Sequence, residues 1–310
     1  MACKSCVHKP VYVTQNHGSL CANHFVKYVE KKVFKTIRQY QLIQRGDTVA
    51  VALSGGKDSS TLLNILKKLQ DKYHGFSLKA VLIDEGIAGY RPLTIKDAKK
   101  FCQQLKVPLE ILSFKSLTGK TLDQMQKTEG KNPCSTCGVL RRYLLNKGAK
   151  LVKASKIATG HNVDDEAQSI LMNSIKGNVE LSAKLGPISG LKVREEFVTR
   201  IKPLYFLLEK EVLIYAKVCK LPVTFVECPN TRLSFRNEVG RLLNELEGKY
   251  PGSKQGIINS FLTTLPLLKK EFSDKVEELR ACEQCGEPSV HALCRACQVI
   301  NIHKKKSKGN

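Results

Sequence analysis

Short apolar runs alternate with amphipathic stretches through the middle of the chain, a pattern that is typical of α/β proteins. The apolar runs predict strands at residues 48–53, 78–83, 109–114 and 156–159. Helical spacing predicts helices at residues 59–69, 94–105, 139–150 and 166–175, and residues 203–271 read as helical with short extended pieces. Such alternation produces βαβ units and a parallel sheet, whose ligands bind at the carboxyl ends of the strands. We therefore expect an α/β domain built on a parallel sheet.

Residues 25–45 have the pattern of a basic amphipathic helix. Phe25, Val29, Val33 and Ile37 recur at helical spacing. The other faces carry Lys27, Lys31, Lys32, Lys35 and Arg38. This pattern predicts either a solvated charged face or a surface that contacts a nucleic acid.

The whole chain is strongly basic. Among 310 residues, 51 are Lys or Arg and 28 are Asp or Glu, which gives a formal net charge of +23. Such an excess favours a polyanionic partner, a nucleic acid before an anionic membrane surface. No apolar run is long enough for a membrane span, and the first residues lack the apolar stretch of a signal peptide. We expect a cytosolic protein without a membrane partner.

The first predicted strand runs directly into Ser54-Gly55-Gly56-Lys57-Asp58-Ser59, and a helix follows. A strand, a Gly-rich loop and a helix N-terminus together form an anion cradle, because backbone N–H groups and the helix dipole point at the ligand. The spacing fits neither a Walker A loop nor G-x-G-x-x-G. The alternative is an ordinary strand–helix turn that uses glycine only for its geometry.

Polar residues also follow two other predicted strands. Asp84-Glu85-Gly86 comes after the second strand, and Gly160-His161-Asn162-Val163-Asp164-Asp165 comes after the fourth. Because ligands of such sheets bind at the carboxyl ends of the strands, these residues are candidates for the same site as the Gly-rich loop.

Twelve cysteines in a cytosolic chain indicate metal ligands or reactive thiols rather than disulfides. Two groups of four have the spacing of structural zinc sites. The N-terminal group is Cys3, Cys6, Cys21 and His24, and the C-terminal group is Cys282, Cys285, Cys294 and Cys297.

A third group lies in the middle of the chain. Cys134 and Cys137 open a predicted helix whose N-terminus and two following arginines should lower the pKa of both thiols. Cys228, which precedes a proline, is the obvious third ligand, and three thiolates suit a 4Fe-4S cluster with one open iron. A Cys134–Cys228 pair could alternatively act as persulfide carrier and resolving thiol, or Cys228 could simply be buried. Cys102 and Cys219 are expected in the core.

Together these motifs resemble one family over essentially the whole chain: the tRNA 2-thiouridine synthetases of the TtuA/NcsA type, in the N-type ATP pyrophosphatase superfamily. The matching features are the N-terminal C-x-x-C…C-x-x-H, S-G-G-K-D-S, Asp84-Glu85-Gly86-Ile87, P-C-x-x-C-G-V-x-R-R, G-H-N-x-D-D, Cys228 and the C-terminal four-cysteine ribbon. The resemblance implies a HUP-type, Rossmann-like parallel sheet at 25–275, zinc modules at 1–24 and 276–303 that help to grip tRNA, and a basic tail at 304–310.

The resemblance also implies a set of site residues and cofactors: ATP with Mg²⁺, a 4Fe-4S cluster and two Zn²⁺. The cluster would be held by Cys134, Cys137 and Cys228. The ATP contacts would be Ala52, Ser54, Gly55, Gly56, Lys57, Asp58, Ser59, Ile83, Arg141, Gly160 and Asp165.

The implied reaction is ATP-dependent 2-thiolation of a tRNA uridine. The C2 oxygen would be adenylated, with Lys57, the loop amides and Mg²⁺ neutralising the departing pyrophosphate, and with Asp58 or Asp165 on the metal. Sulfide at the open iron would then displace AMP. Asn, Gln and spare Cys residues indicate a mesophile and favour the wobble position over T-loop uridine 54.

Three other interpretations compete with this one. A two-thiocytidine type of tRNA thiolase would share the loop and the cluster cysteines but not the two zinc modules. A zinc-stabilised RNA-binding protein could carry a vestigial nucleotide fold, and an N-type synthetase could amidate a small molecule. The sulfur donor, either sulfide or a thiocarboxylated ubiquitin-like carrier, stays open, and a homodimer is implied only by the resemblance.

Overall fold

The computed structural model describes residues 2–14, 18–129, 133–192, 194, 196–226, 228–231, 235–274 and 278–305. The predicted basic tail beyond residue 305 lies outside these residues. Within them, no helix is both long and apolar enough to cross a membrane.

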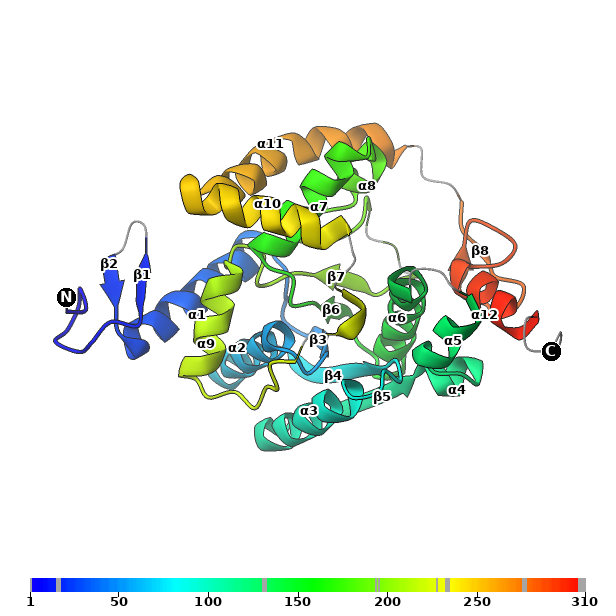
Figure 1. Ribbon diagram of the computed structural model, residues 1–310, viewed down its shortest axis with the longest axis horizontal. Helices are drawn as coiled ribbons and strands as arrows, with labels where there is room; N and C mark the ends of the chain where they lie inside the picture. The colour runs from blue at the N-terminus through cyan, green and yellow to red at the C-terminus, as the bar shows by residue number, and fades with distance from the viewer. Residues whose placement is uncertain are drawn as a thin grey trace.

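A five-stranded parallel sheet forms the centre of the molecule (Figure 1). Its order is β5-β4-β3-β6-β7. The strands are β3 (Thr48–Ala52), β4 (Ser77–Asp84), β5 (Leu109–Ser113), β6 (Lys156–Ala158) and β7 (Thr199–Ile201). The four predicted strands are confirmed. The fifth, β7, was not predicted, because Thr-Arg-Ile is too short and too polar to stand out and becomes a strand only by pairing with β6.

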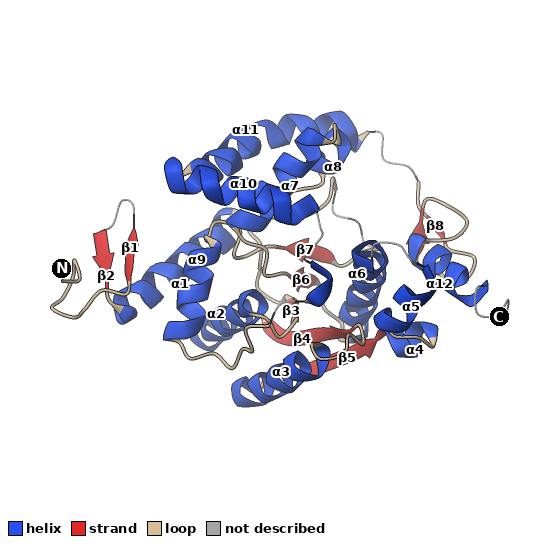
Figure 2. Ribbon diagram, in the orientation of Figure 1, coloured by secondary structure: helices blue, strands red, loops and turns tan. Residues whose placement is uncertain are grey.

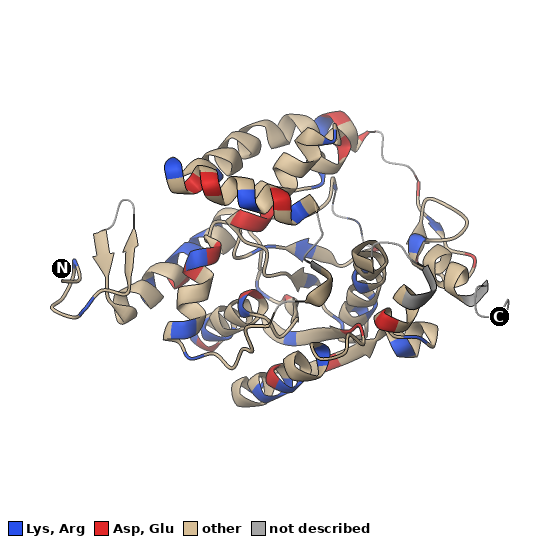
Figure 3. Ribbon diagram, viewed as in Figure 1, with Lys and Arg blue, Asp and Glu red and all other residues tan. Residues whose placement is uncertain are grey.

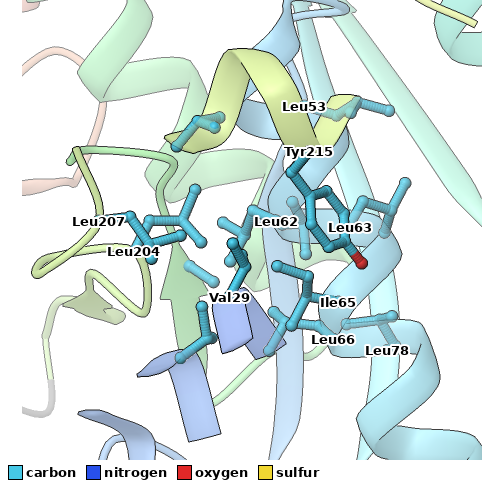
Figure 4. Packing of buried hydrophobic residues seen from close by; sticks show 14 of the residues in the cluster. Val29, Leu53, Leu62, Leu63, Ile65, Leu66, Leu78, Leu204, Leu207 and Tyr215 are labelled. Atoms are coloured by element: carbon cyan, nitrogen blue, oxygen red, sulfur yellow. The ribbon is translucent and has the colours of Figure 1, made fainter. Parts of the chain in front are cut away.

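Alternate residues of the strands face two different cores, as the two-residue period of a strand requires. Val51 and Ile201 belong to a core covered by α1 (Ala22–Gln39), α2 (Lys57–Tyr73), α3 (Arg91–Leu105) and α9 (Glu209–Val218). Figure 4 shows this core, in which Leu62 and Leu66 of α2 pack near Val29 of α1 and Tyr215 of α9.

The opposite face of the sheet buries Ala50 and Ile157. It is covered by α4 (Phe114–Thr118), α5 (Leu122–Glu129) and α6 (Pro133–Leu151), shown in Figure 2. Helix α6 packs tightly on the sheet, because a Cβ on Gly148 would lie only 2.6 Å from a methyl group of Val81.

A helical layer with its own core lies beside the β7 edge of the sheet (Figure 1). It consists of α7 (Val163–Ile175), α8 (Val179–Ala183), α10 (Phe235–Lys249) and α11 (Ser253–Ser273). A short 3-10 helix, η1 (Pro229–Thr231), contacts α6. Because α7 begins a few residues after β6, this layer lies near the carboxyl end of that strand.

Two small modules lie at opposite ends of the molecule (Figure 1). The N-terminal module is the hairpin of β1 (Tyr12–Thr14) and β2 (Gly18–Leu20), and it leads directly into α1. Helix α1 starts three residues earlier and ends six residues earlier than predicted, because Gln41 adopts a positive φ of 48°. Phe25, Val29, Val33 and Ile37 are buried as predicted.

The C-terminal module consists of β8 (Arg280–Ala281), β9 (Pro288–Ser289) and α12 (Arg295–Lys305). Its cysteines Cys282, Cys294 and Cys297 share a core with Leu140 and Leu144 of α6. Glu287 accepts hydrogen bonds from Asn146 at 3.2 Å and Lys150 at 2.9 Å. The module is thus docked along the same helix that carries the central C-x-x-C motif.

Candidate functional site

The loop between β3 and α2 is closed on itself by its two serines. Ser54 N donates to Ser59 Oγ at 3.1 Å, and Ser59 Oγ donates to Gly56 O at 3.2 Å. Gly55 has a φ of +80°, and a Cβ there would lie 2.4 Å from the carbonyl oxygen of Thr94. Gly56 is the N-cap of α2 and supplies no capping side chain. The geometry therefore leaves the start of α2 suited to an anion.

Lys57 lies between two carboxylates at the start of α2. Its Nζ is 2.8 Å from Glu209 Oε1 and 3.1 Å from Asp58 Oδ2. Burial opposes the charged form of Lys57, but Asp58 and Glu209 raise its pKa above the ordinary value. Burial also raises the pKa of Asp58, and the charge of Asp165 acts in the same direction. Glu209 was not predicted, and only the fold brings it to the loop.

The turn after β6 lies against this loop. A Cβ on Gly160 would be 2.9 Å from the carbonyl carbon of Asp58, so glycine is required for the close approach. Asn162 Nδ2 donates to Asp58 Oδ1 at 3.2 Å, and Asn162 N donates to Asp165 Oδ2 at 3.2 Å. Asn162 therefore positions both carboxylates that were proposed from the sequence. This residue belongs to the predicted G-H-N-x-D-D motif, but the sequence did not indicate this role for it.

A cavity of about 690 Å³ opens beside these residues, between the first turns of α2 and α7 and the helices α9 and α10. Asp58, Asp165 and Glu209 line it together with Lys57 and Arg236. Burial raises the pKa of Asp165, while Arg236, whose Nη1 donates to the backbone oxygen of Asp165 at 3.3 Å, lowers it. Carboxylates beside cations suit a polyanionic ligand with a divalent cation, because hard cations prefer oxygen ligands.

Ala52 and Ile83 lie at the ends of β3 and β4 and face the α6 side of the sheet. Next to them, buried Glu85 contacts two arginines: Arg91 Nε at 2.5 Å and Arg141 Nε at 2.9 Å. Arg91 also donates to the backbone oxygens of Ser54, at 2.7 Å, and of Ile83. Arg91 was not predicted. The signal for it was an arginine close after the carboxyl end of a strand, near a glutamate that needs a partner once buried.

The structure brings the three central cysteines into one corner. Cys134 Sγ lies 3.4 Å from the carbonyl oxygen of Asn230 in η1, and Cys228 packs against the core that contains Cys137. Arg141 Nη2 donates to Cys137 Sγ at 3.3 Å. Cys134 is exposed, Cys228 half-buried and Cys137 buried. Three thiols of this kind at one corner fit the donor set of an iron–sulfur cluster.

The predicted lowering of the pKa of Cys134 and Cys137 is wrong. Burial raises the pKa of Cys137, and desolvation by neighbouring groups also raises that of Cys134, although this residue is exposed; the nearby charge of Arg141 only partly opposes both shifts. One reason is that Arg141 also pairs with Glu85, so its charge is shared. Cys102 is buried as predicted, and Cys219 is half-buried beside the same core.

Each terminal module brings four ligand atoms together. A tetrahedral site with Zn–S of about 2.3 Å and Zn–N of about 2.0 Å places its ligands about 3.5–3.8 Å apart. In the N-terminal module, Cys6 Sγ and Cys21 Sγ are 3.5 Å apart, and His24 Nδ1 lies 3.3–3.6 Å from the sulfurs of Cys3, Cys6 and Cys21.

The C-terminal module has the same arrangement. Cys285 Sγ and Cys294 Sγ are 3.6 Å apart, and Cys282 and Cys297 complete a set within 4.8 Å. Both sets therefore match the dimensions of a tetrahedral zinc site, and the sequence had placed all eight ligands.

Comparison with known proteins gives a consistent result. The profile of a family described as a PP-loop domain matches residues 26–245. The tRNA-5-methyluridine(54) 2-sulfurtransferase of Pyrococcus horikoshii is 36% identical over 307 residues, 98% of this chain and 95% of that protein. Cytoplasmic tRNA 2-thiolation protein 1 of Danio rerio is 35% identical, over 96% of this chain and 87% of that protein.

A solved structure is also similar. The U34-tRNA thiolase NcsA from Methanococcus maripaludis, determined with its [4Fe-4S] cluster, superposes with a TM-score of 0.80 and 33% identity. The match covers 97% of this chain and 96% of that one.

Proposed function

Because this chain belongs to the PP-loop family of tRNA 2-thiolation proteins, we propose that it adenylates the C2 oxygen of a tRNA uridine with ATP and replaces that oxygen with sulfur. One observation carries the proposal: the Gly-rich loop and the three-cysteine corner lie at the same edge of the sheet. Arg91 and Arg141 both pair with Glu85. Arg91 also contacts the loop, and Arg141 also contacts Cys137, so the three side chains connect the two parts of the site.

ATP would bind over the carboxyl ends of β3 and β4. Its adenine would rest by Ala52 and Ile83, and its phosphates would meet Arg141, Gly160 and the loop residues Ser54, Gly55, Gly56, Lys57 and Ser59. Asp58 or Asp165 would hold Mg²⁺. This assignment is supported by the cavity between α2 and α7, where both carboxylates lie beside Lys57.

The first step would join the uridine O2 to the α-phosphorus of ATP, as the bond from that phosphorus to pyrophosphate breaks. Lys57 and the amides at the start of α2 would stabilise the charge that grows on the departing pyrophosphate. Arg141 would face the adenylated base, a role supported by its contacts with Glu85 and Cys137. In the second step sulfur would bond to C2, and AMP would leave with the former O2.

Cys134, Cys137 and Cys228 would hold a 4Fe-4S cluster with an open iron position, which supplies a deprotonated sulfur nucleophile near neutral pH. The proposal is supported by their common corner and by the cluster in the similar NcsA structure. Each terminal module would hold one Zn²⁺, with the catalytic domain at 25–275 between modules at 1–24 and 276–303. These modules and the exposed lysines of α1 would help to bind tRNA.

For the position of the target we favour the wobble uridine, supported by the similarity to U34-tRNA thiolase NcsA. Uridine 54 is the second candidate, favoured by the 36% identity with the Pyrococcus horikoshii enzyme. The names of the relatives support a cytoplasmic location. The sulfur donor would be sulfide or a thiocarboxylated ubiquitin-like protein, and the protein could act as a homodimer.

The decisive experiment is anaerobic reconstitution with iron and sulfide, followed by ATP-dependent thiolation of defined tRNA, with the product located by mass spectrometry. We expect one thiolated uridine and one pyrophosphate per event. Cys228→Ala should lose both thiolation and the visible absorbance of the cluster, whereas the control Cys219→Ala should keep both. ATP-independent thiolation, or full activity of Cys228→Ala with an intact cluster spectrum, would overturn the proposal. If the wild-type protein released no pyrophosphate from ATP in the presence of tRNA, the result would favour the RNA-binding protein without catalytic activity.

A further inference from the structure

Two arginines from different elements meet next to the three-cysteine corner, and the function proposed above does not use either of them. Arg142 lies in α6, five residues after Cys137, and Arg200 is the middle residue of β7. Arg200 Nη2 donates to the backbone oxygen of Arg142 at 3.1 Å.

A second hydrogen bond fixes this alignment of α6 and β7. The backbone N–H of Val198 donates to Asn146 Oδ1 at 3.1 Å. Arg142 and Asn146 are one helical turn apart on α6, and Val198, which directly precedes β7, is two residues from Arg200. The two hydrogen bonds therefore hold β7 and the residue before it against α6, and Arg200 reaches the backbone of that helix.

The side chain of Arg142 runs back toward the start of α6. Its Nη1 would lie 3.5 Å from a Cβ built on Gly138, the residue after Cys137. Long helical side chains point toward the helix N-terminus, which is the direction seen here. The Arg142 guanidinium consequently lies on the side of α6 that leads to the cysteines, and the Arg200 guanidinium contacts the backbone one turn further along the same helix.

Neither arginine forms an ion pair with a carboxylate within the part of the chain that the structure describes, unlike neighbouring cations. Arg141 pairs with Glu85, Lys150 with Glu287, and Lys202 with Glu166. Desolvation by neighbouring groups and the charge of Arg141 lower the pKa of Arg142, although its side chain is exposed and Cys137 acts in the opposite direction. Desolvation and the charge of Arg142 lower the pKa of half-buried Arg200. The charge of Arg142 thus disfavours the charged form of Arg200, and an anion that contacted both arginines would relieve this repulsion.

We propose that Arg142 and Arg200 form a binding site for an RNA backbone phosphate next to the uridine that is thiolated. This inference rests on the proposed function, because it supplies the grip that holds the target nucleotide at the cysteine corner. A planar guanidinium donates two parallel hydrogen bonds to phosphate, so two of them on fixed backbones define both the place and the orientation of the strand. Lys and Arg are spread over α1, α3 and α6 (Figure 3). Arg142 lies on the helix that also carries Cys134 and Cys137, and Arg200 contacts that helix.

The test compares tRNA binding by full-length wild type, Arg142→Gln, Arg200→Gln and the double variant over a range of salt concentrations. We expect each single variant to weaken binding about 3- to 10-fold and to lower the slope of log affinity against log salt by roughly 0.7–0.9. The double variant should lose less than the product of the two, because both arginines would hold one phosphate. The matched control is Arg45→Gln, which lies before β3 at the amino end of the strands, and it should bind like wild type.

Two further measurements separate this site from folding and from the nucleotide site. ATP affinity and the visible absorbance of the cluster should be unchanged in both Gln variants, and the variants Arg142→Lys and Arg200→Lys should recover the salt slope but only part of the affinity. Unchanged tRNA affinity and slope in the Gln variants would overturn the inference while leaving the proposed function intact. Loss of ATP affinity with unchanged tRNA affinity would also overturn it. If wild type bound and thiolated no tRNA at all, the proposed function itself would fail.

Discussion

The guanidinium of Arg141 lies 3.3 Å from the sulfur of Cys137, and this contact joins the two halves of the site. The neighbouring Nε of the same guanidinium pairs with Glu85 at 2.9 Å, and Glu85 in turn pairs with Arg91, which contacts the Gly-rich loop. A change at the loop can therefore reach the cysteine corner through three side chains.

Replacement of Arg141 should disturb both halves. In Arg141→Ala the pKa of Cys137 should rise further, because the charge that opposes burial is removed. We expect slower alkylation of Cys137 at neutral pH in cluster-free protein, measured by peptide mass spectrometry, and a loss of thiolation of about 100-fold. Lys147→Ala, an exposed position on the same helix, is the control. An unchanged alkylation rate would contradict the role given to Arg141.

Replacement of Gly160 should push the loop out of place. In Gly160→Ala the new methyl group would meet backbone atoms of Asp58 and Ser59 at 2.9–3.0 Å, which cannot move independently. We expect a stability loss of about 1–3 kcal/mol and a fall in pyrophosphate release of about 10- to 100-fold. Gly248→Ala in α10 is the matched control, because a Cβ there meets nothing within 4 Å. Equal effects at the two positions would show that the close approach is not needed.

The ionised side chain of Asp165 should lower the stability of the folded protein. Burial is the main cause that raises its pKa, so the folded protein binds this proton more tightly than the unfolded chain and loses stability as the pH rises through the folded-state value. Asp165→Asn should therefore raise the melting temperature by roughly 1–3 °C at neutral pH, and the gain should shrink in acid. Pyrophosphate release should be lost in the same variant. The control Asp274→Asn, at an exposed residue, should change neither property.

Metal content should follow the two terminal modules. Wild-type protein should contain two zinc ions per chain by elemental analysis, because each module places four ligands at tetrahedral spacing. Cys6→Ser and Cys285→Ser should each reduce this number to one and leave the absorbance of the iron–sulfur cluster. Retention of both zinc ions in either variant would rule out the corresponding ligand set.

Several features were accessible from the sequence because they depend on local spacing. The order of strands and helices follows from runs and periods of apolar residues, and four strands appear where these predicted them. The two zinc-type ligand sets follow from paired knuckles, since a C-x-x-C or C-x-x-H turn already brings two ligands together. The Gly-rich loop was recognisable because Ser54-Gly55-Gly56-Lys57-Asp58-Ser59 directly follows a predicted strand. In the structure Gly55 has the positive φ that glycine readily adopts.

Other features depend on residues that only the fold brings together. Strand β7 exists because β6 offers it a pairing edge, and Arg200 reaches α6 only as a consequence. Glu209 meets Lys57 across 152 positions of the chain, and Asn162 meets Asp58 across 104. No local pattern contains such pairs, so they could not be assigned to the site in advance.

The three-cysteine corner combines one property that the sequence predicts with one that depends on the fold. The sequence by itself determined which cysteines are ligand candidates, because spacing and residue type decide what can bind a metal. Only the tertiary structure decided the direction in which their pKa values shift, because desolvation depends on how α6 and η1 pack, and here it outweighs Arg141 and raises the pKa of Cys134 and Cys137. Desolvation and long-range charge are properties of the packed molecule, whereas ligand identity and loop geometry are properties of the chain.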